Sequence, residues 1–377
     1  MHASQEVMRR LGELKAEIDA VLAVHAKRLQ QQTAQDYTPY SVQAVEAYTQ
    51  VLARGGKRIR GALTVVGYDM CGGSDRAMIL QAACAIELVH AYILVLDDIM
   101  DKSATRRGGP SAHAALSDYH RRHSLSSDSA HFGEAVAINS ALIGNHYAQS
   151  LVTGLAVADN RKVKVLHLLN EALVVTGHGQ INDIFNEVVD TVDDHAVDKV
   201  LEWKTAYYTF LNPLQFGMAL AGADDTTLEA IRPFCMAAGR AFQITDDILG
   251  TFASEQEAGK SPMDDIREGK RTVLSVTALE RASDADKNFL IQMLGNNTLT
   301  QAEFARCKEI FINTGALQYA TERAAATSAR QRLHYVIRRW TLPNRAGNSS
   351  ARLSIRCKAV TSNLHSSTNR KTLRKDS

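Results

Sequence analysis

The sequence predicts an all-α protein built as one large helical bundle, and three observations support that fold class. Apolar residues recur at three- and four-residue spacing along most of the chain, which is the period of one helix face. Only 6 of the 377 residues are proline, which leaves room for long uninterrupted helices. No alternating run of apolar and polar residues is flanked by hairpin turns, so we predict no sheet.

The expected helices follow one another with glycine-containing breaks between them. The first carries a stripe made of Leu11, Leu14, Ile18, Val21 and Leu22. Similar stripes predict helices over residues 41–52, 75–98, 134–155, 162–175, 197–221, 228–249, 272–282 and, more weakly, 301–336. Glycine pairs or Gly-Asn-Asn mark breaks at 55–56, 72–73, 108–110 and 295–297. We therefore expect one domain over residues 1–337 and a separate tail over 338–377.

Charge is divided unevenly between these two parts. The 43 Lys+Arg and 41 Asp+Glu nearly cancel, yet residues 338–377 hold ten basic residues and one acidic residue. The tail thus carries +9 and the remainder −7. A basic segment with few apolar residues is typical of disorder or of binding to anionic membrane surfaces. A shifted reading frame that replaces the natural C-terminus is the third interpretation, and the one we prefer.

Cysteine usage and hydropathy predict the compartment. Five cysteines lie far apart with no Cys-x-x-Cys pair, which argues against a disulfide framework and favours a reducing cytoplasm. The charged N-terminus has no apolar core of signal-peptide length. The most apolar run, residues 82–96, contains Glu87 and His90 and is shorter than the roughly 20 residues of a membrane span. We expect a cytoplasmic protein with no transmembrane segment. No nucleic-acid-binding motif is present.

Two aspartates, Asp97 and Asp101, end the apolar helix expected over residues 75–98, with Asp98 between them. At this spacing both carboxylates lie on one helix face, about 5–6 Å apart at Cβ. Like charges repel, and the helix C-terminus also disfavours anions. A divalent cation relieves both effects, and a few hard oxygen ligands suit Mg²⁺ that also binds water and phosphate. A solvated acidic helix end is the alternative for this motif taken alone.

A second aspartate pair, Asp246–Asp247, closes the apolar stretch over residues 228–249. Two such pairs on two apolar helices are costly to bury without a counter-ion. If they face each other across a bundle, they line a mouth that binds several Mg²⁺ ions and an oligophosphate.

Basic residues lie at the ends of several expected elements. Arginine offers bidentate contacts to phosphate and lysine a point charge, although each residue taken singly is more typical of a surface. The set comprises Lys57, Arg58, Arg60, Arg106, Arg107, Lys204, Lys260 and Lys270. The sequence before Lys260 lacks the upstream glycine of a P-loop. His120 and His123 have no metal-ligand partners nearby in sequence and are expected to face solvent.

Together these motifs resemble the trans-isoprenyl diphosphate synthases, also called polyprenyl synthetases. The order and spacing match across about residues 50–280, through GGKRIRG, ELVH, DDIMDKSATRRG, GQIND, KTA, FQITDD and GKSPMDDIREGKRTVL. The resemblance implies an all-α bundle around a deep apolar cavity, assembled as a homodimer. It also implies a Mg²⁺-dependent prenyltransferase that condenses an allylic diphosphate with isopentenyl diphosphate head-to-tail and releases pyrophosphate.

The same resemblance implies roles for individual residues. The ligands of three Mg²⁺ ions would be Asp97, Asp101 and Asp246, with Asp98 and Asp247 in support. The residues that hold the allylic diphosphate would be Arg106, Lys204 and Lys260, with Thr205 and Gln243 beside the reacting carbon. The residues that hold isopentenyl diphosphate would be Lys57, Arg60, His90 and Arg107.

Product length is expected to depend on the floor of the cavity. Tyr92 lies five residues before Asp97, about 7.5 Å deeper along the helix, and Ile93 follows it. One aromatic residue here without a second, and no insertion in DDIMD, resembles the geranylgeranyl (C20) type, with farnesyl (C15) next. Ordinary core packing of Tyr92 is the alternative.

Two departures from the family pattern leave other functions open. Gly250 replaces the last aspartate of the second motif, which is expected to weaken activity, and residues 141–145 lack a Gly-Asp pair common in relatives. Gly250 motivates a catalytically impaired subunit of a heteromeric synthase. A class I terpene cyclase is a further alternative, but it has no use for an isopentenyl site such as Lys57, Arg60 and His90.

Overall fold

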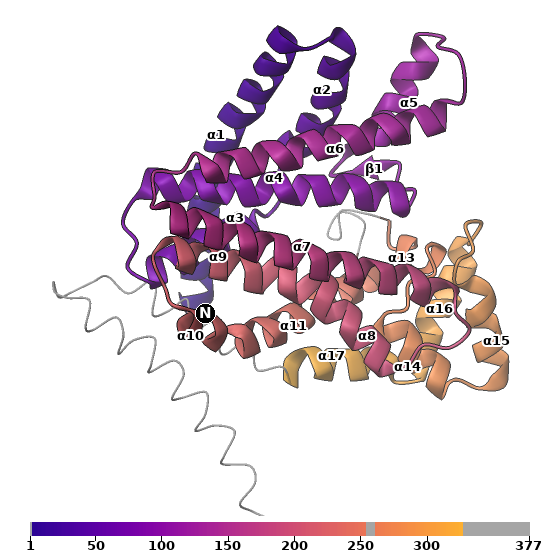
Figure 1. Ribbon diagram of the computed structural model, residues 1–377. Helices are drawn as coiled ribbons and strands as arrows, with labels where there is room; N and C mark the ends of the chain where they lie inside the picture. Colours follow the sequence, from indigo (N-terminus) through magenta and orange to yellow (C-terminus); the bar gives the residue numbers. More distant parts are fainter. Residues whose placement is uncertain (1, 254–260, 327–377) are drawn as a thin grey trace, which may run out of the picture.

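Helices make up most of the computed structural model, which describes residues 2–253 and 261–326 (Figure 1). In chain order they are α1 (His2–Asp36), α2 (Pro39–Ala53), α3 (Ile59–Met70), α4 (Arg76–Met100), α5 (Ala112–Arg122), α6 (Ser129–Thr153), α7 (Asp159–Val188), α8 (Asp194–Val200), the π-helix η1 (Leu201–Leu211), α9 (Asn212–Leu220), α10 (Asp225–Ala230), α11 (Arg232–Phe252), α13 (Asp264–Arg267), α14 (Val273–Arg281), α15 (Asp284–Met293), α16 (Gln301–Asn313) and α17 (Ala316–Ala326). The all-α prediction is confirmed. The basic tail and the expected boundary at residue 337 lie outside the described residues.

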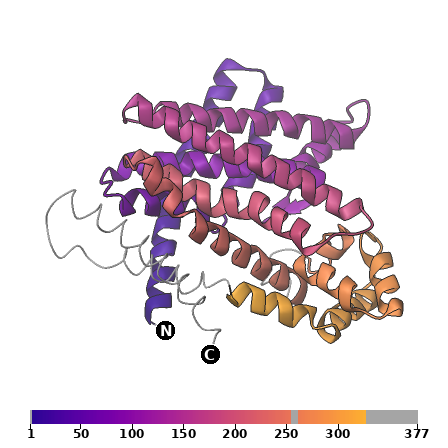
Figure 2. The same ribbon diagram turned by 60° about the horizontal axis from the view of Figure 1, so that its bottom comes forward.

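The helices pack around two apolar clusters. The larger cluster joins α1 to α7 with η1, α9 and α11. The smaller one joins α8 and the end of α11 to α13–α17, which gather at one end of the molecule (Figures 1 and 2). In Figure 1 α4, α6 and α7 run lengthwise through the body, and the helical hairpin of α1 and α2 projects from it.

Helix α4 forms the centre of the larger cluster and leads to the first aspartate motif. It starts where the side chain of Asp75 accepts a hydrogen bond from the Met78 amide (2.9 Å), which satisfies one free amide of the first turn. Its length and composition alone would let α4 cross a membrane, but 61% of its most apolar window is buried inside the protein. A core helix of a globular protein has this property.

The expected helix over residues 197–221 is divided into α8, η1 and α9, and its middle is a π-helix. Sequence periodicity at 3.6 residues does not predict this wider turn, which is rare and frequently found at functional sites. Two glycines permit neighbouring helices to approach it closely. A Cβ on Gly179 of α7 would lie 2.5 Å from Lys204 N, and one on Gly239 of α11 would lie 2.3 Å from Ala206 Cα.

Three other expectations were wrong in detail. A short antiparallel pair, β1 (Thr105–Arg106) with β2 (Gly109–Pro110), follows α4 where no strand was expected. His120 is buried against Phe132 and contacts Ser126 O (3.1 Å), because α6 covers that face of α5, whereas His123 is exposed as expected. Helix α11 runs past the second aspartate pair to Phe252, so that pair does not close the helix.

Candidate active site

A cavity of about 1790 Å³ opens between α4, α7, η1, α11 and the loops that follow α4 and precede α14. Most of the predicted site residues line it, although they come from α3, α4, η1, α11 and the β1–β2 segment. The predicted residues that line the cavity are Arg60, His90, Tyr92, Ile93, Asp97, Asp101, Arg106, Arg107, Lys204, Thr205, Gln243 and Asp246. Asp98, Asp247 and Lys57 do not line it, and Lys260 lies outside the described residues.

The first aspartate motif separates into two environments. Asp97 and Asp101, one helical turn apart, face the cavity and pair with Lys204 (3.5 Å) and Lys270 (3.3 Å), respectively. Burial raises the pKa of Asp101, and the charge of Asp97 adds to this effect. Burial acts the same way on Asp97, but the ammonium groups of Lys204 and Lys270 outweigh it and lower its pKa. The two carboxylates therefore share one crowded acidic wall.

Asp98 lies on the other side of α4 and is fully buried. It accepts a hydrogen bond from Arg106 Nε (2.7 Å), which links the end of α4 to the β1–β2 turn. Burial raises the pKa of Asp98 to about 6 in spite of this arginine. Asp98 thus orients Arg106 at the cavity rim and does not face the cavity itself.

The second aspartate motif is also divided. Asp246 is exposed at the cavity wall, while Asp247 is buried behind it. Asp247 accepts a hydrogen bond from Gln243 Nε2 (2.8 Å), and Gln243 Oε1 accepts one from Thr205 Oγ1 (2.8 Å). This chain connects α11 to η1 and fixes the amide of Gln243 at the cavity. Gly250 lies one turn further along α11 and is buried.

Two acidic residues of α7 to which the sequence motifs assigned no role, Asp183 and Glu187, lie next to this wall. Asp183 of α7 pairs with Lys204 (2.7 Å), which places this lysine between Asp183 and Asp97. Although burial opposes it, the charges of these aspartates raise the pKa of Lys204, which therefore stays cationic. Glu187, one turn beyond Asp183, lines the cavity, whereas Asp183 does not, and burial together with Asp183 raises the pKa of Glu187 to about 7. The four-residue spacing of Asp183 and Glu187, which puts both on one helix face, is the signal in the sequence that could have found them.

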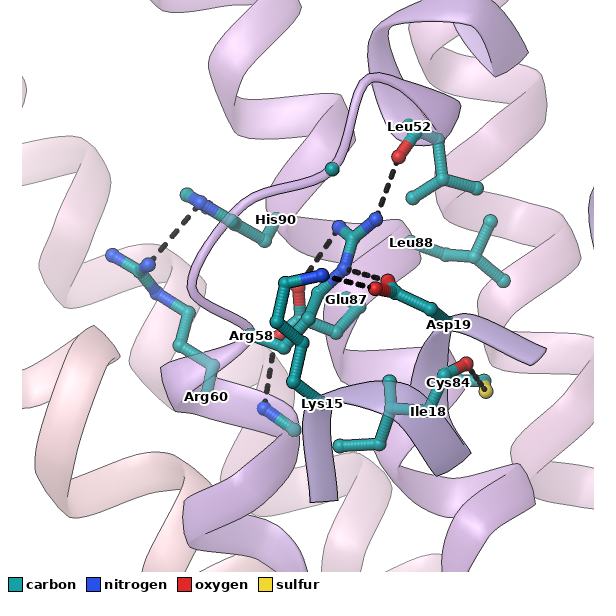
Figure 3. A network of polar contacts seen from close by, with 12 residues as sticks. Lys15, Ile18, Asp19, Leu52, Arg58, Arg60, Cys84, Glu87, Leu88 and His90 are labelled. Carbon is teal, nitrogen blue, oxygen red and sulfur yellow. Dashed lines mark hydrogen bonds and ion pairs between the residues drawn. The ribbon is translucent and has the colours of Figure 1, made fainter. Parts of the chain in front are cut away.

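A cationic corner lies at a different part of the same cavity. Arg60 Nη1 donates to His90 Nε2 (3.2 Å; Figure 3). Its Nη2 donates to Thr209 Oγ1 (2.6 Å). Since arginine can only donate, the ring proton of His90 resides on Nδ1. His90 Nδ1 and Arg60 Nε are buried and have no partner among the described residues. Burial and the charge of Arg60 hold the pKa of His90 well below its usual value. These donors are available to an anionic ligand.

The remaining wall is apolar and lies deeper, toward the N-terminal sides of α4 and α7. Tyr92, Ile93 and Leu96 line it from α4, and Leu173 lines it from α7. Gly177 of α7 also lines it, and a Cβ on this residue would meet nothing within 4 Å. One cavity therefore joins an acidic wall, a cationic corner and an apolar extension.

The donors at the acidic wall fit Mg²⁺ held jointly with a phosphate ligand. Within residues 2–253 and 261–326, no three acidic, histidine or cysteine side chains are arranged to hold a metal by themselves. Mg²⁺ ordinarily takes one or two carboxylates and completes its octahedron with water and substrate phosphates. Burial and, to a lesser extent, the charge of Asp97 raise the pKa of Asp101, and a bound cation would favour the ionised carboxylates instead. Asp97, Asp101 and Asp246 have the donor chemistry for such ions.

Known proteins have similar sequences and folds. Residues 42–311 match the polyprenyl synthetase family. Geranylgeranyl diphosphate synthase of Saccharolobus solfataricus is 32% identical over 280 residues, which cover 74% of this chain and 79% of that protein. Short chain isoprenyl diphosphate synthase of Methanocaldococcus jannaschii is 33% identical over 263 residues, covering 69% and 73%.

A solved structure agrees with this assignment. Geranylgeranyl pyrophosphate synthase from Corynebacterium glutamicum, complexed with isoprenyl diphosphate and magnesium, superposes with a TM-score of 0.79 at 26% identity. The match covers 92% of this chain and 98% of that one. Since the family match spans well over half of the chain and the folds superpose over nearly their whole length, the chain belongs to the polyprenyl synthetase family.

Proposed function

We propose that the protein is a prenyltransferase that condenses an allylic diphosphate with isopentenyl diphosphate head-to-tail and releases pyrophosphate. One observation carries this proposal: a single cavity joins the acidic wall of Asp97 and Asp101 to the cationic corner of Arg60 and His90 and to an apolar extension. Two diphosphates and a hydrocarbon chain need these three surfaces within reach of one another. Relatives named geranylgeranyl, geranylfarnesyl and farnesyl diphosphate synthases support the same reaction.

The allylic diphosphate is proposed to bind at the acidic wall through Mg²⁺. The residues that would hold the ions, three by family resemblance, are Asp97, Asp101 and Asp246. Bound Mg²⁺ would neutralise charge on the departing pyrophosphate. Lys204 and Arg106 supply fixed positive charge at the same wall, and the raised pKa of Lys204 keeps it protonated. Lys260 is proposed to add a third cation, although it lies outside the described residues.

Isopentenyl diphosphate is proposed to bind at the cationic corner. The unpartnered donors of Arg60 and His90 and the guanidinium of Arg107 suit its diphosphate. Lys57, which is exposed and does not line the cavity, is proposed as a further ligand by family resemblance. Once the allylic C1–O bond breaks, the isopentenyl double bond attacks C1, and pyrophosphate accepts the proton that is lost. Apolar walls exclude water from the allylic cation, and Thr205 with Gln243 lines the cavity near Lys204.

We propose a C20 product, with C15 the alternative, because Tyr92 lies in the apolar extension. We further propose that the enzyme is a cytoplasmic homodimer. Relatives named as synthases favour an active enzyme over an impaired subunit or a terpene cyclase.

The test incubates purified protein with Mg²⁺, isopentenyl diphosphate and allylic diphosphates of increasing length, and then sizes the products by chromatography. Elongated prenyl diphosphates support the proposal, whereas release of a hydrocarbon identifies a terpene cyclase. Product that forms only when a partner subunit is added identifies an impaired subunit. The variant Asp246→Asn should lose most turnover. The matched control, Asp225→Asn, removes an exposed carboxylate on α10 outside the cavity and should change little.

For the impaired-subunit alternative the informative variant is Gly250→Asp, which restores the family residue. If wild-type turnover is already high and the variant is no faster, the missing aspartate has no functional cost. A large gain would instead show that Gly250 limits the enzyme.

A further inference from the structure

Arg58 lies in sequence between Lys57 and Arg60, both proposed to bind isopentenyl diphosphate, but its side chain points away from that of Arg60 (Figure 3). Its neighbour Lys57 is exposed and Arg60 lines the cavity, whereas the Arg58 side chain is 3% exposed. The loop that carries it has an unusual backbone, with left-handed φ angles at Gly55 (84°), Gly56 (139°) and Arg58 (49°). A non-glycine residue in this region needs surrounding contacts to hold it there.

The guanidinium of Arg58 supplies those contacts by joining three helices. Its Nε donates to Asp19 of α1 (2.7 Å), and its Nη2 donates to the carbonyl of Leu52 near the end of α2 (2.7 Å). Its Nη1 donates to Glu87 of α4 (3.4 Å). The segment between α2 and α3 is thereby fastened to the body of the protein from its buried side (Figure 3).

Glu87 connects this anchor to the cavity. Its carboxylate, 2% exposed, accepts the Gly61 amide (2.8 Å) in the first turn of α3 as well as Arg58. His90, almost one turn further along α4, accepts from Arg60 on the cavity side. Two contacts side by side, Glu87 with Arg58 and His90 with Arg60, therefore set the distance between α4 and the start of α3.

The same loop also positions Arg107. This arginine donates to the carbonyl of Gly55, and a Cβ on Gly56 would lie 2.8 Å from its guanidinium carbon. A shift of residues 55–58 would thus move Arg107 and Arg60 together, while the contacts of Asp97 and Lys204 lie on other elements.

We propose that Arg58, Asp19 and Glu87 are positioning residues that hold the isopentenyl diphosphate side of the cavity without touching either substrate. This inference rests on the proposed function. A buried ion pair contributes little net stability compared with apolar packing, so its value here is a defined loop conformation. Loss of the anchor should affect one substrate and spare the other, because the loop carries ligands for only one of them.

The test compares Asp19→Asn and Glu87→Gln with the control Glu17→Gln. Glu17 joins the same two helices, α1 and α4, through Arg76 (2.8 Å), but it makes no contact with the 55–58 loop. We expect the KM for isopentenyl diphosphate to rise about 10- to 100-fold in Glu87→Gln, because misplacement on the order of 1 Å has effects of this size. Asp19→Asn should show a smaller rise, because the Asp19 carboxylate is partly exposed. The KM for the allylic diphosphate should change less than about twofold in both.

The deciding result is whether the KM for isopentenyl diphosphate changes while the KM for the allylic diphosphate does not. A merely structural role would alter both KM values, or would lower only the amount of active enzyme. Equal changes for the two substrates, or no change in folded Asp19→Asn, would overturn the inference. If Glu87→Gln does not fold, Asp19→Asn alone decides. If wild-type protein makes no prenyl diphosphate, the proposed function fails. The inference is then tested by titration calorimetry with isopentenyl diphosphate alone, where unchanged affinity in Asp19→Asn refutes it.

Discussion

The close approach of α7 to the π-helix η1 leads to a sharp prediction about Gly179. A methyl group there would lie 2.5 Å from the amide nitrogen of Lys204 and 2.8 Å from the carbonyl carbon of Trp203. Ordinary contact begins near 3.4 Å, so the Lys204 backbone must move by about 0.9 Å in Gly179→Ala. This displacement acts directly on the lysine that lies between Asp97 and Asp183.

Two effects of opposite sign determine the stability of Gly179→Ala. Alanine favours a helix interior over glycine by roughly 0.5–1 kcal/mol, while overpacking costs typically about 1–3 kcal/mol. The free energy of unfolding should therefore fall by about 1–2 kcal/mol. Displacement of Lys204 should lower kcat/KM for the allylic diphosphate by about 10- to 100-fold.

Gly12 on α1 provides a control, because it is exposed in a helix outside the cavity and a methyl group there meets nothing within 4 Å. Gly12→Ala should gain roughly the 0.5–1 kcal/mol of helix propensity and retain its turnover. Urea unfolding and steady-state kinetics on the two variants give both quantities. If Gly179→Ala equals Gly12→Ala in stability and in kcat/KM, the close packing of α7 on η1 does not position Lys204.

Three further predictions concern product length, pH and metal. Tyr92→Ala should lengthen the main product, because it deepens the apolar extension, whereas Tyr147→Ala on α6 should not; unchanged chain length on product chromatography would contradict this. In metal-free protein the pKa of Glu187 is about 7, against 4.5 for an unperturbed glutamate. Between these two pH values Glu187 therefore binds its proton more tightly in the folded state than in the unfolded state. The free energy of unfolding should thus fall as pH rises from about 4.5 to 7, and Glu187→Gln should flatten this decline in denaturant titrations. Mg²⁺ with pyrophosphate should raise the melting midpoint, because a ligand at a hundred times its Kd stabilises the folded state by about 2.7 kcal/mol, and EDTA should reverse the rise. A shift of equal size in Asp101→Asn would exclude that carboxylate as a ligand.

Much of the candidate site could be predicted from sequence because its residues occur in motifs of fixed spacing. Residues four apart lie on the same face of a helix, so the spacing of Asp97 and Asp101 predicts that they lie together. The structure places both at the cavity. Spacing does not indicate which neighbour turns inward, however. Arg58 and Asp98 belong to the same motifs but are buried on the opposite sides of their elements, and Asp183 acquires its role only through Lys204.

The sequence alone determined the fold class and the family, because helical periodicity and the spacing of residues within each motif are local properties of the chain. Only the tertiary structure decided how the cavity is assembled. The π-helix η1 packs against Gly179 and Gly239, which come from other helices, and His120 is buried because α6 covers it. Contacts between distant segments arise from packing, so no local pattern can specify them.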